Sequence, residues 1–174
     1  SFVAPSNPTT TFNGVIGSSY ILRWTISNAL CTTSSDDVLI TFNANPTAAN
    51  AGADQTSLCG VTSTSLSANT PTVGTGAWSI VSGVGGSFVA PSNPTTTFNG
   101  VIGSSYVLRW TISNAPCAAN SDDVLITFNA NPTVANAGAD QTSLCGVAST
   151  SLSANTPTVG TGAWSIVSGV GGSF

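Results

Sequence analysis

The stretch that decides the fold is Ser105-Tyr106-Val107-Leu108-Arg109-Trp110-Thr111-Ile112-Ser113-Asn114. In an extended chain its alternate residues Tyr106, Leu108, Trp110 and Ile112 lie on one side, and the residues between them lie on the other. This period of two predicts a β-strand with one buried face. The same ten residues occur earlier, from Ser19 to Asn28, with Ile21 in place of Val107. Whatever this strand organises is therefore present twice.

The whole chain consists of one sequence unit that repeats. Ser1-Phe2-Val3-Ala4-Pro5 returns as Ser87-Phe88-Val89-Ala90-Pro91, so the period is 86 residues. A unit of this length is longer than the roughly 20 to 50 residues of a solenoid repeat, and it suits one small β domain. The residues 1–88 and 87–174 differ at seven aligned positions: Ile21/Val107, Leu30/Pro116, Thr32/Ala118, Thr33/Ala119, Ser34/Asn120, Ala48/Val134 and Thr62/Ala148.

The boundaries of the repeat are set by proline. Asn45-Pro46-Thr47 and Asn131-Pro132-Thr133 each follow an apolar, strand-like run, and proline after a strand marks a natural boundary. We therefore predict one complete Ig-like or PKD-like repeat at residues 45–130. Residues 1–44, the leading half-repeat, are the C-terminal half of a preceding repeat. Residues 131–174, the trailing half-repeat, are the N-terminal half of a following one.

The composition is poor in charge and lacks four residue types. The chain has no His, Met, Lys or Glu, and its charges come from Arg23, Arg109 and six aspartates. A net charge of −4 argues against nucleic acid and anionic membranes as partners. No apolar run approaches the roughly 20 residues of a membrane span, so we expect no membrane insertion in this segment. We expect instead the interior of a longer exported protein.

The cysteine content also favours an exported protein. Four cysteines occur in a small, β-rich chain without CxxC pairs or histidine partners. This pattern is more typical of an oxidising, extracellular setting than of a redox or metal site.

The strands of the complete repeat are predicted from alternation and turn residues. Six or seven short antiparallel strands with an inward Trp and an inward Tyr are typical of an all-β sandwich. A loop is expected at Ala115–Ser121, and prolines 91 and 94 suit an edge strand. The expected strands are Ala48–Leu58 (irregular at Gly52), Thr62–Ala68, Gly76–Val81, Ser87–Val89, Thr95–Phe98, Ser105–Asn114 and Asp123–Phe128. The expected core residues are Leu66, Trp78, Phe98, Tyr106, Leu108, Trp110, Ile112, Val124, Ile126 and Phe128.

Several of these motifs resemble a known family. They are Asn50-Ala51-Gly52-Ala53-Asp54-Gln55-Thr56, the central Trp strand, Gly103-x-x-Tyr106, and Asp123-Val124-Leu125-Ile126-Thr127. Together they look like the PKD-like and immunoglobulin-like repeats of bacterial surface proteins. With Cys59 and Cys117 added, the pattern is similar to repeats in giant adhesins of gliding bacteria exported by the type IX secretion route.

The resemblance covers the whole chain and implies a function, but it brings no functional site with it. It implies a stalk or filament of tandem domains on the cell surface, acting as a force-bearing spacer in attachment or gliding motility. The implied partners are neighbouring repeats of the same chain and other copies in a filament. These repeats carry no family catalytic motif, so no catalytic residue or cofactor is expected.

The cysteines recur as Cys31/Cys117 and Cys59/Cys145. The favoured hypothesis is a structural disulfide between Cys59 and Cys117 within the complete repeat, contributing about 3 to 4 kcal/mol in the chain-entropy model. In a simple sandwich, however, the two cysteines fall at opposite poles, about 17 to 20 Å apart, which is too far for a disulfide. A bent first strand would restore this bridge. A bridge between repeats and free thiols remain as alternatives.

The aspartates near the linkers invite a Ca²⁺ hypothesis. Asp36-Asp37, Asp122-Asp123, Asp54 and Asp140 supply carboxylates, but Ca²⁺ needs six to eight oxygen ligands and no known loop pattern is present. The favoured interpretation is that Asp122 and Asp123 cap a turn and that Asp54 bonds backbone in a turn. No metal site is therefore predicted.

The tryptophans, arginines and serines are the remaining candidates for binding or catalysis. Trp78 and Trp110 would suit sugar stacking, but their phase places them in the core. Arg23 and Arg109 lie on the opposite face, where each is expected to pair with an aspartate or to lie across the sheet surface, with carboxylate binding as the less favoured alternative. With no His or Lys, neither acid-base catalysis nor serine activation is expected, and the protein is not predicted to be an enzyme. Two alternatives stay open: repeats that bind surface glycans by avidity, and subunits that self-assemble by strand addition.

Overall fold

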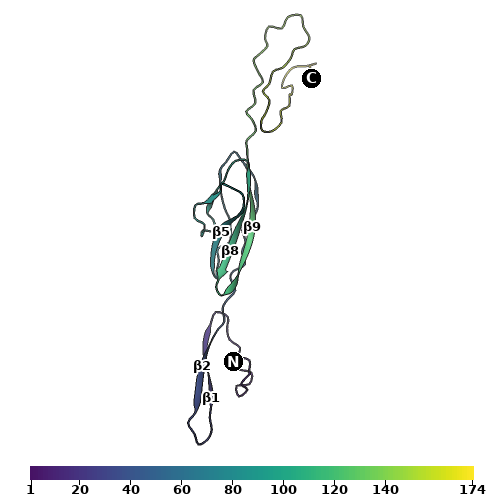
Figure 1. Cartoon of the computed structure of the whole chain (residues 1–174). Helices are drawn as coiled ribbons and strands as arrows, with labels where there is room; N and C mark the ends of the chain where they lie inside the picture. Colours follow the sequence, from purple (N-terminus) through teal and green to yellow (C-terminus); the bar gives the residue numbers. More distant parts are fainter.

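The computed structural model describes all 174 residues, with nine β-strands and no helix. The all-β prediction is confirmed. Figure 1 shows three parts placed end to end: a hairpin near the N-terminus, a central body that contains β5, β8 and β9, and a strandless C-terminal part. All 13 buried residues lie between Ala51 and Phe128. The only hydrophobic core is therefore inside the complete repeat.

Two sheets form the complete repeat. The larger has the strand order β3-β9-β8-β5 and the smaller has the order β4-β7-β6. Twelve buried apolar residues drawn from both sheets and from the first segment make one core cluster, which is the arrangement of a β-sandwich. The strands are β3 (Gln55–Cys59), β4 (Ser63–Ser65), β5 (Thr75–Ser82), β6 (Ser87–Phe88), β7 (Thr97–Asn99), β8 (Ser104–Asn114) and β9 (Cys117–Asn129).

Strand β8 is the centre of the core. Its alternate residues Tyr106, Leu108, Trp110 and Ile112 are all fully buried, because β8 lies between β5 and β9 with one face against the second sheet. Trp110 packs against Trp78 of β5, with ring centroids 5.2 Å apart. All ten residues expected in the core are buried, together with Ala51, Ala68 and Thr96.

The last strand is longer than expected. β9 begins at Cys117 and not at Asp123, so most of the expected loop Ala115–Ser121 is strand. The physical reason is continued pairing with β8, which runs out to Asn114 opposite Cys117. The hairpin between β8 and β9 is therefore tight and extends to the end of the domain.

Two further expectations about strands are wrong. The first strand is confined to Gln55–Cys59 and pairs with β9 in parallel, whereas an antiparallel arrangement was expected. The segment Thr95–Phe98 was expected at an edge, but β7 lies between β4 and β6. The prolines lie in the connection between β6 and β7, where the Pro91 and Pro94 carbonyls accept hydrogen bonds from Trp78 N and Ala68 N.

The half-repeats keep only part of this architecture. The leading half-repeat forms an antiparallel hairpin of β1 (Ser19–Ile26) and β2 (Ser34–Thr41). The trailing half-repeat has no strand, although its residues 161–168 are the same as those of β5. Both strands that would pair with it, the counterparts of β8 and β9, belong to the other half of a repeat. Each half-repeat therefore lacks a second sheet over its apolar face, although in the leading one Tyr20 packs against Phe12 and Phe42.

Candidate functional site

The first segment of the complete repeat is tied to β9 along its length. Ala49 N donates a hydrogen bond to Asn120 Oδ1 at 2.6 Å, and Ala51 N donates to Asp122 Oδ2 at 2.8 Å. Further along, Leu125 N of β9 donates to Asp54 Oδ1 at 2.8 Å. These bonds bridge residues about 71 positions apart in sequence. The segment that enters the domain is thus held against the strand that leaves it.

The parallel ladder between β3 and β9 continues this attachment. Gln55 lies opposite Ile126, and Cys59 lies opposite Asn129. Asn129 Nδ2 also donates to the carbonyls of Thr56 (2.8 Å) and Leu58 (3.3 Å). We call the contacts from Ala49 to Cys59 along β9 the terminal clamp. It joins the two ends of the complete repeat by backbone pairing and by side-chain bonds from both strands.

The junction with the leading half-repeat has its own contact. Asn114 Nδ2, at the end of β8, donates to the carbonyl of Ala44 at 2.8 Å. The linker residue Thr47 is also fixed, because its N donates to Val73 O and its Oγ1 accepts from Val73 N. The linker is therefore hydrogen-bonded both to the end of β8 and to the loop that precedes β5.

An ion pair lies on the outer face of the larger sheet. Arg109 Nε and Nη2 donate to Asp123 Oδ1 and Oδ2 at 2.7 and 2.8 Å, a two-pronged pair between directly opposed residues. The Arg109 hydrogen bond lowers the pKa of Asp123 below its ordinary range. Arg23 and Asp37 repeat the same pair in the leading half-repeat. The expected aspartate partner of each arginine is therefore present.

The aspartates of the complete repeat are engaged in these contacts. Asp54 and Asp122 accept backbone N–H groups, and Asp123 accepts from Arg109. Asp122 and Asp123 lie within β9 and not at a turn, so the turn-capping interpretation is wrong. No group of three or more His, Cys, Asp or Glu side chains is arranged to hold a metal ion.

Cys59 and Cys117 lie at opposite ends of the same strand. Cys117 is the first residue of β9, and Cys59 pairs with Asn129, the last. Twelve residue steps of about 3.3 Å put the two cysteines roughly 40 Å apart, whereas bonded Cα atoms lie within about 7 Å. The favoured disulfide within the repeat is therefore wrong. The first strand does not bend back, because its parallel pairing carries it away from Cys117. All four cysteines are free thiols.

The tryptophans of the complete repeat are not a surface platform. Trp110 is fully buried, and Trp78 is 4% exposed with its Nε1 donating to the Pro94 carbonyl at 3.3 Å. Their counterparts in the half-repeats, Trp24 and Trp164, are 43% and 44% exposed. The same residue type is thus core in one part of the chain and surface in the others.

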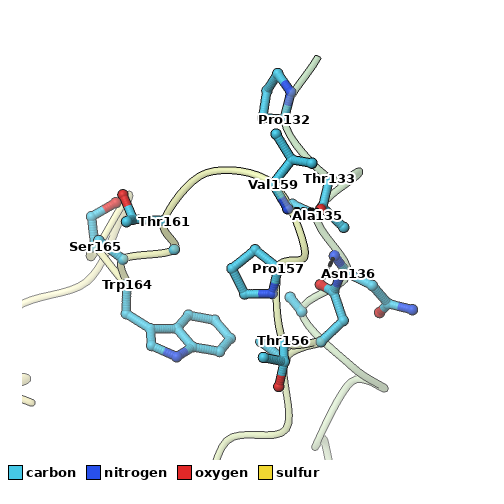
Figure 2. A pocket seen from close by; sticks show the side chains of 15 residues that line it. Pro132, Thr133, Ala135, Asn136, Thr156, Pro157, Val159, Thr161, Trp164 and Ser165 are labelled. Carbon is cyan, nitrogen blue, oxygen red and sulfur yellow. Dashed lines mark hydrogen bonds between the residues drawn. The ribbon is translucent and has the colours of Figure 1, made fainter. Parts of the chain in front are cut away.

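The trailing half-repeat contains an open cavity of about 540 Å³. Figure 2 shows the Trp164 indole with Pro157 beside it in this view and Val159 farther away, all three among the residues that line the cavity. Its lining also includes Gly162, which lies two positions before Trp164 in the sequence. The cavity is mostly apolar and carries no charged side chain. It suits an apolar side chain and offers no chemistry.

Sequence reasoning missed the asparagines that organise the ends. Asn114, Asn120 and Asn129 bond backbone groups about 70 residues away. The sequence signal for them was weak: Asn114 ends a predicted strand, Asn129 directly follows one, and Asn120 lies in the expected loop. The turn end of the β8–β9 hairpin is also where the two copies of the repeat differ most, at Leu30/Pro116 and at neighbouring positions that include Ser34/Asn120.

Comparison with known proteins gave no family assignment: no protein-family model matches the chain, and no curated protein matches it. The structure contains no helix long and apolar enough to cross a membrane.

Proposed function

We propose that the chain is a structural repeat segment of a long extracellular adhesin or filament. Its folded repeats serve as force-bearing spacers in surface attachment or gliding motility. The resemblance to PKD-like and Ig-like repeats of bacterial surface proteins supports the location and the class. The terminal clamp supports the load-bearing role, and it is the observation that carries the proposal.

The clamp is oriented to resist pulling along the chain. Tension enters the complete repeat at Ala44 and leaves at Asn131, at opposite ends of the parallel pair of β3 and β9. Pulling on these two ends slides the parallel strands past one another. All clamp bonds are then loaded together, whereas a hairpin pulled at its open end breaks one bond at a time. Parallel pairing of the first and last strands therefore favours resistance to force.

The side-chain bonds add to this resistance. Asp54 and Asp122 are charged acceptors, and hydrogen bonds to charged groups are stronger than those between neutral groups. Both attach the entering segment to β9 just before the backbone ladder, which begins at Gln55 opposite Ile126. Their removal would leave fewer bonds to share the same load.

Single-molecule force spectroscopy on the chain, held by tags at its two ends, tests the proposal. Only the complete repeat has a core, so one unfolding event is expected, with a contour-length gain on the order of 25 nm for 86 residues. Asp54→Ala is expected to lower the unfolding force.

Asp140→Ala is the matched control. Asp140 occupies the position of Asp54 in the strandless trailing half-repeat, so its loss should leave the force unchanged. An Asp54→Ala chain that unfolds at the same force as the Asp140→Ala chain would contradict a load-bearing clamp.

A further inference from the structure

We propose that the residue at position 120 sets how firmly the repeat holds its entry segment, and thereby how strong the repeat is as a link. The entry segment is residues 48–52, which lead into β3. Asn120 stands at this position in the complete repeat, and Ser34 is its counterpart in the leading half-repeat. The inference rests on the load-bearing role proposed above, and it names the position that regulates the terminal clamp.

The differences between the two copies of the repeat gather at one end of the domain. Five of the seven lie at the turn end of the β8–β9 hairpin or at the start of the entry segment: Leu30/Pro116, Thr32/Ala118, Thr33/Ala119, Ser34/Asn120 and Ala48/Val134. A groove of about 360 Å³ lies at the same end and is lined by Asn45, Pro46, Ala48, Ala118, Ala119 and Asn120. Variation is therefore concentrated where the entry segment meets β9.

The entry segment is bonded like a strand, but by side chains. Ala49 N donates to Asn120 Oδ1 at 2.6 Å, and Ala51 N donates to Asp122 Oδ2 at 2.8 Å. The two donors are two residues apart, and so are the two acceptors on β9, because alternate residues of an extended chain face the same way. These two bonds stand in for a backbone ladder. Both therefore depend on which side chains β9 carries.

The opposite side of the entry segment is held by Asn69. Its Nδ2 donates to the Ala48 carbonyl at 2.9 Å, and its Oδ1 accepts from Asn50 N at 2.8 Å. Asn155 makes the same two bonds in the trailing half-repeat, which has no strand. This attachment is thus common to both copies and forms without β9. The attachment to β9 is the one that varies.

Among the side chains of the clamp on β9 and β3, only position 120 changes. The others are identical in both copies: Asp36/Asp122, Asn43/Asn129 and Asp54/Asp140. Ser34 lies opposite Ile26 as Asn120 lies opposite Ile112, so the two residues occupy the same place in their hairpins. The serine oxygen is bonded directly to Cβ, whereas the amide oxygen of asparagine lies one bond further out. A serine therefore falls short of the amide that Asn120 reaches at 2.6 Å.

The missing bond has a mechanical consequence. A repeat with serine at this position holds its entry segment to β9 by one bond fewer. Tension reaches the entry segment before it reaches β3, so the clamp of such a repeat opens at a lower force. In an array that contains both kinds of repeat, those with serine unfold first and those with asparagine last.

Four variants of the complete repeat separate position 120 from its surroundings. Asn120→Ser introduces the residue of the other copy, and Asn120 is exposed, so the variant should fold. Asn120→Asp keeps an acceptor oxygen in the same place and tests for rescue. Ala118→Thr combined with Ala119→Thr introduces the neighbouring differences and leaves Asn120 unchanged. Val107→Ile is the matched control, because it is also a difference between the copies but lies on the outer face of β8.

Amide hydrogen exchange followed by NMR measures the bond itself. In Asn120→Ser the Ala49 amide is expected to exchange about two- to tenfold faster than in the unmodified chain, as loss of one hydrogen bond predicts. The other three variants are expected to keep the exchange rate. An unchanged rate at Ala49 in Asn120→Ser would overturn the proposal. So would a uniform increase at all slowly exchanging amides, because it indicates a general loss of stability.

Single-molecule force spectroscopy measures the strength of the link. Asn120→Ser is expected to lower the unfolding force, and the other three variants are expected to keep it. If Asp54→Ala lowers the force and Asn120→Ser does not, the clamp bears load but position 120 does not regulate it. If neither lowers the force, the load-bearing role fails as well. An equal loss of force in the double threonine variant would also refute a special role for Asn120.

Discussion

Cys59 and Cys117 lie at the two ends of β9, Cys117 as its first residue and Cys59 opposite its last. Each cysteine therefore belongs to a different junction. Cys117 follows Asn114, whose side chain bonds the Ala44 carbonyl, and Cys59 lies next to the linker that begins at Asn131. The cysteines divide between the entry and the exit of the repeat and do not brace its interior.

Peptide mapping of the oxidised chain should therefore contain no Cys59–Cys117 disulfide. Any bridge that forms on oxidation should join cysteines of two different chains. Mixing chains of two isotopic compositions before oxidation distinguishes bridges between copies from bridges within one. A Cys59–Cys117 peptide in good yield would contradict the register of β3 and β9.

Tyr106→Phe should destabilise the complete repeat. The Tyr106 hydroxyl accepts from Val101 N at 2.9 Å and donates to Val84 O at 3.0 Å, and its ring is fully buried. Loss of the hydroxyl leaves partly buried backbone groups unpaired, which costs about 1 to 3 kcal/mol. Urea unfolding followed by Trp fluorescence measures the change in the free energy of unfolding.

Tyr20→Phe is the control for this measurement. Tyr20 is the counterpart of Tyr106 and accepts from Val15 N, but it lies in a half-repeat without a buried core. Its hydroxyl can be removed with little change in the unfolding of the complete repeat. Equal effects of the two substitutions would contradict the structure.

Gly76→Ala should destabilise the complete repeat by about 1 to 3 kcal/mol, the usual cost of overpacking a core. The added methyl group would meet the Trp110 ring, which is fully buried. Gly162→Ala should leave the unfolding transition unchanged, because nothing lies within 4 Å of a Cβ placed on Gly162. If both alanines are tolerated equally, the contact between Gly76 and Trp110 is wrong.

The ion pair predicts a specific acid dependence. Because the folded-state pKa of Asp123 is lowered from 3.8, the pair contributes stability above pH 3.8 and loses it as the pH falls through the lower, folded value. The melting temperature of the unmodified chain should exceed that of Asp123→Asn at pH 6. The difference should be small, since both side chains are about 40% exposed.

Below pH 3.8 this difference should shrink as Asp123 takes up a proton. Differential scanning calorimetry of both chains from pH 7 to pH 2 measures it. A difference that grows on acidification would have the wrong sign for a carboxylate held by Arg109.

Much of the core was predictable because it follows alternation. The alternation from Ser105 to Asn114 predicted a buried face made of every second residue from Tyr106 to Ile112, and the structure buries those residues. The parallel pairing of β3 with β9 was not predictable, since alternation fixes which side chains point inward but not which strand lies alongside. Asn114 and Asn120 were missed for the same reason, because their partners lie about 70 residues away.

The repeat itself separates what sequence and tertiary structure each decide. The sequence alone determines the apolar and polar faces of each segment, the turns and the phase of the repeat. It does not decide which segments become strands. Thr75–Ser82 is a strand and residues 161–168 with the same residues are not; Trp78 is buried and Trp164 is exposed. A strand forms where another strand completes its hydrogen bonds, and it becomes part of a stable core where a second sheet covers its apolar face. β1 and β2 meet only the first condition, and in this chain only residues 45–130 meet both.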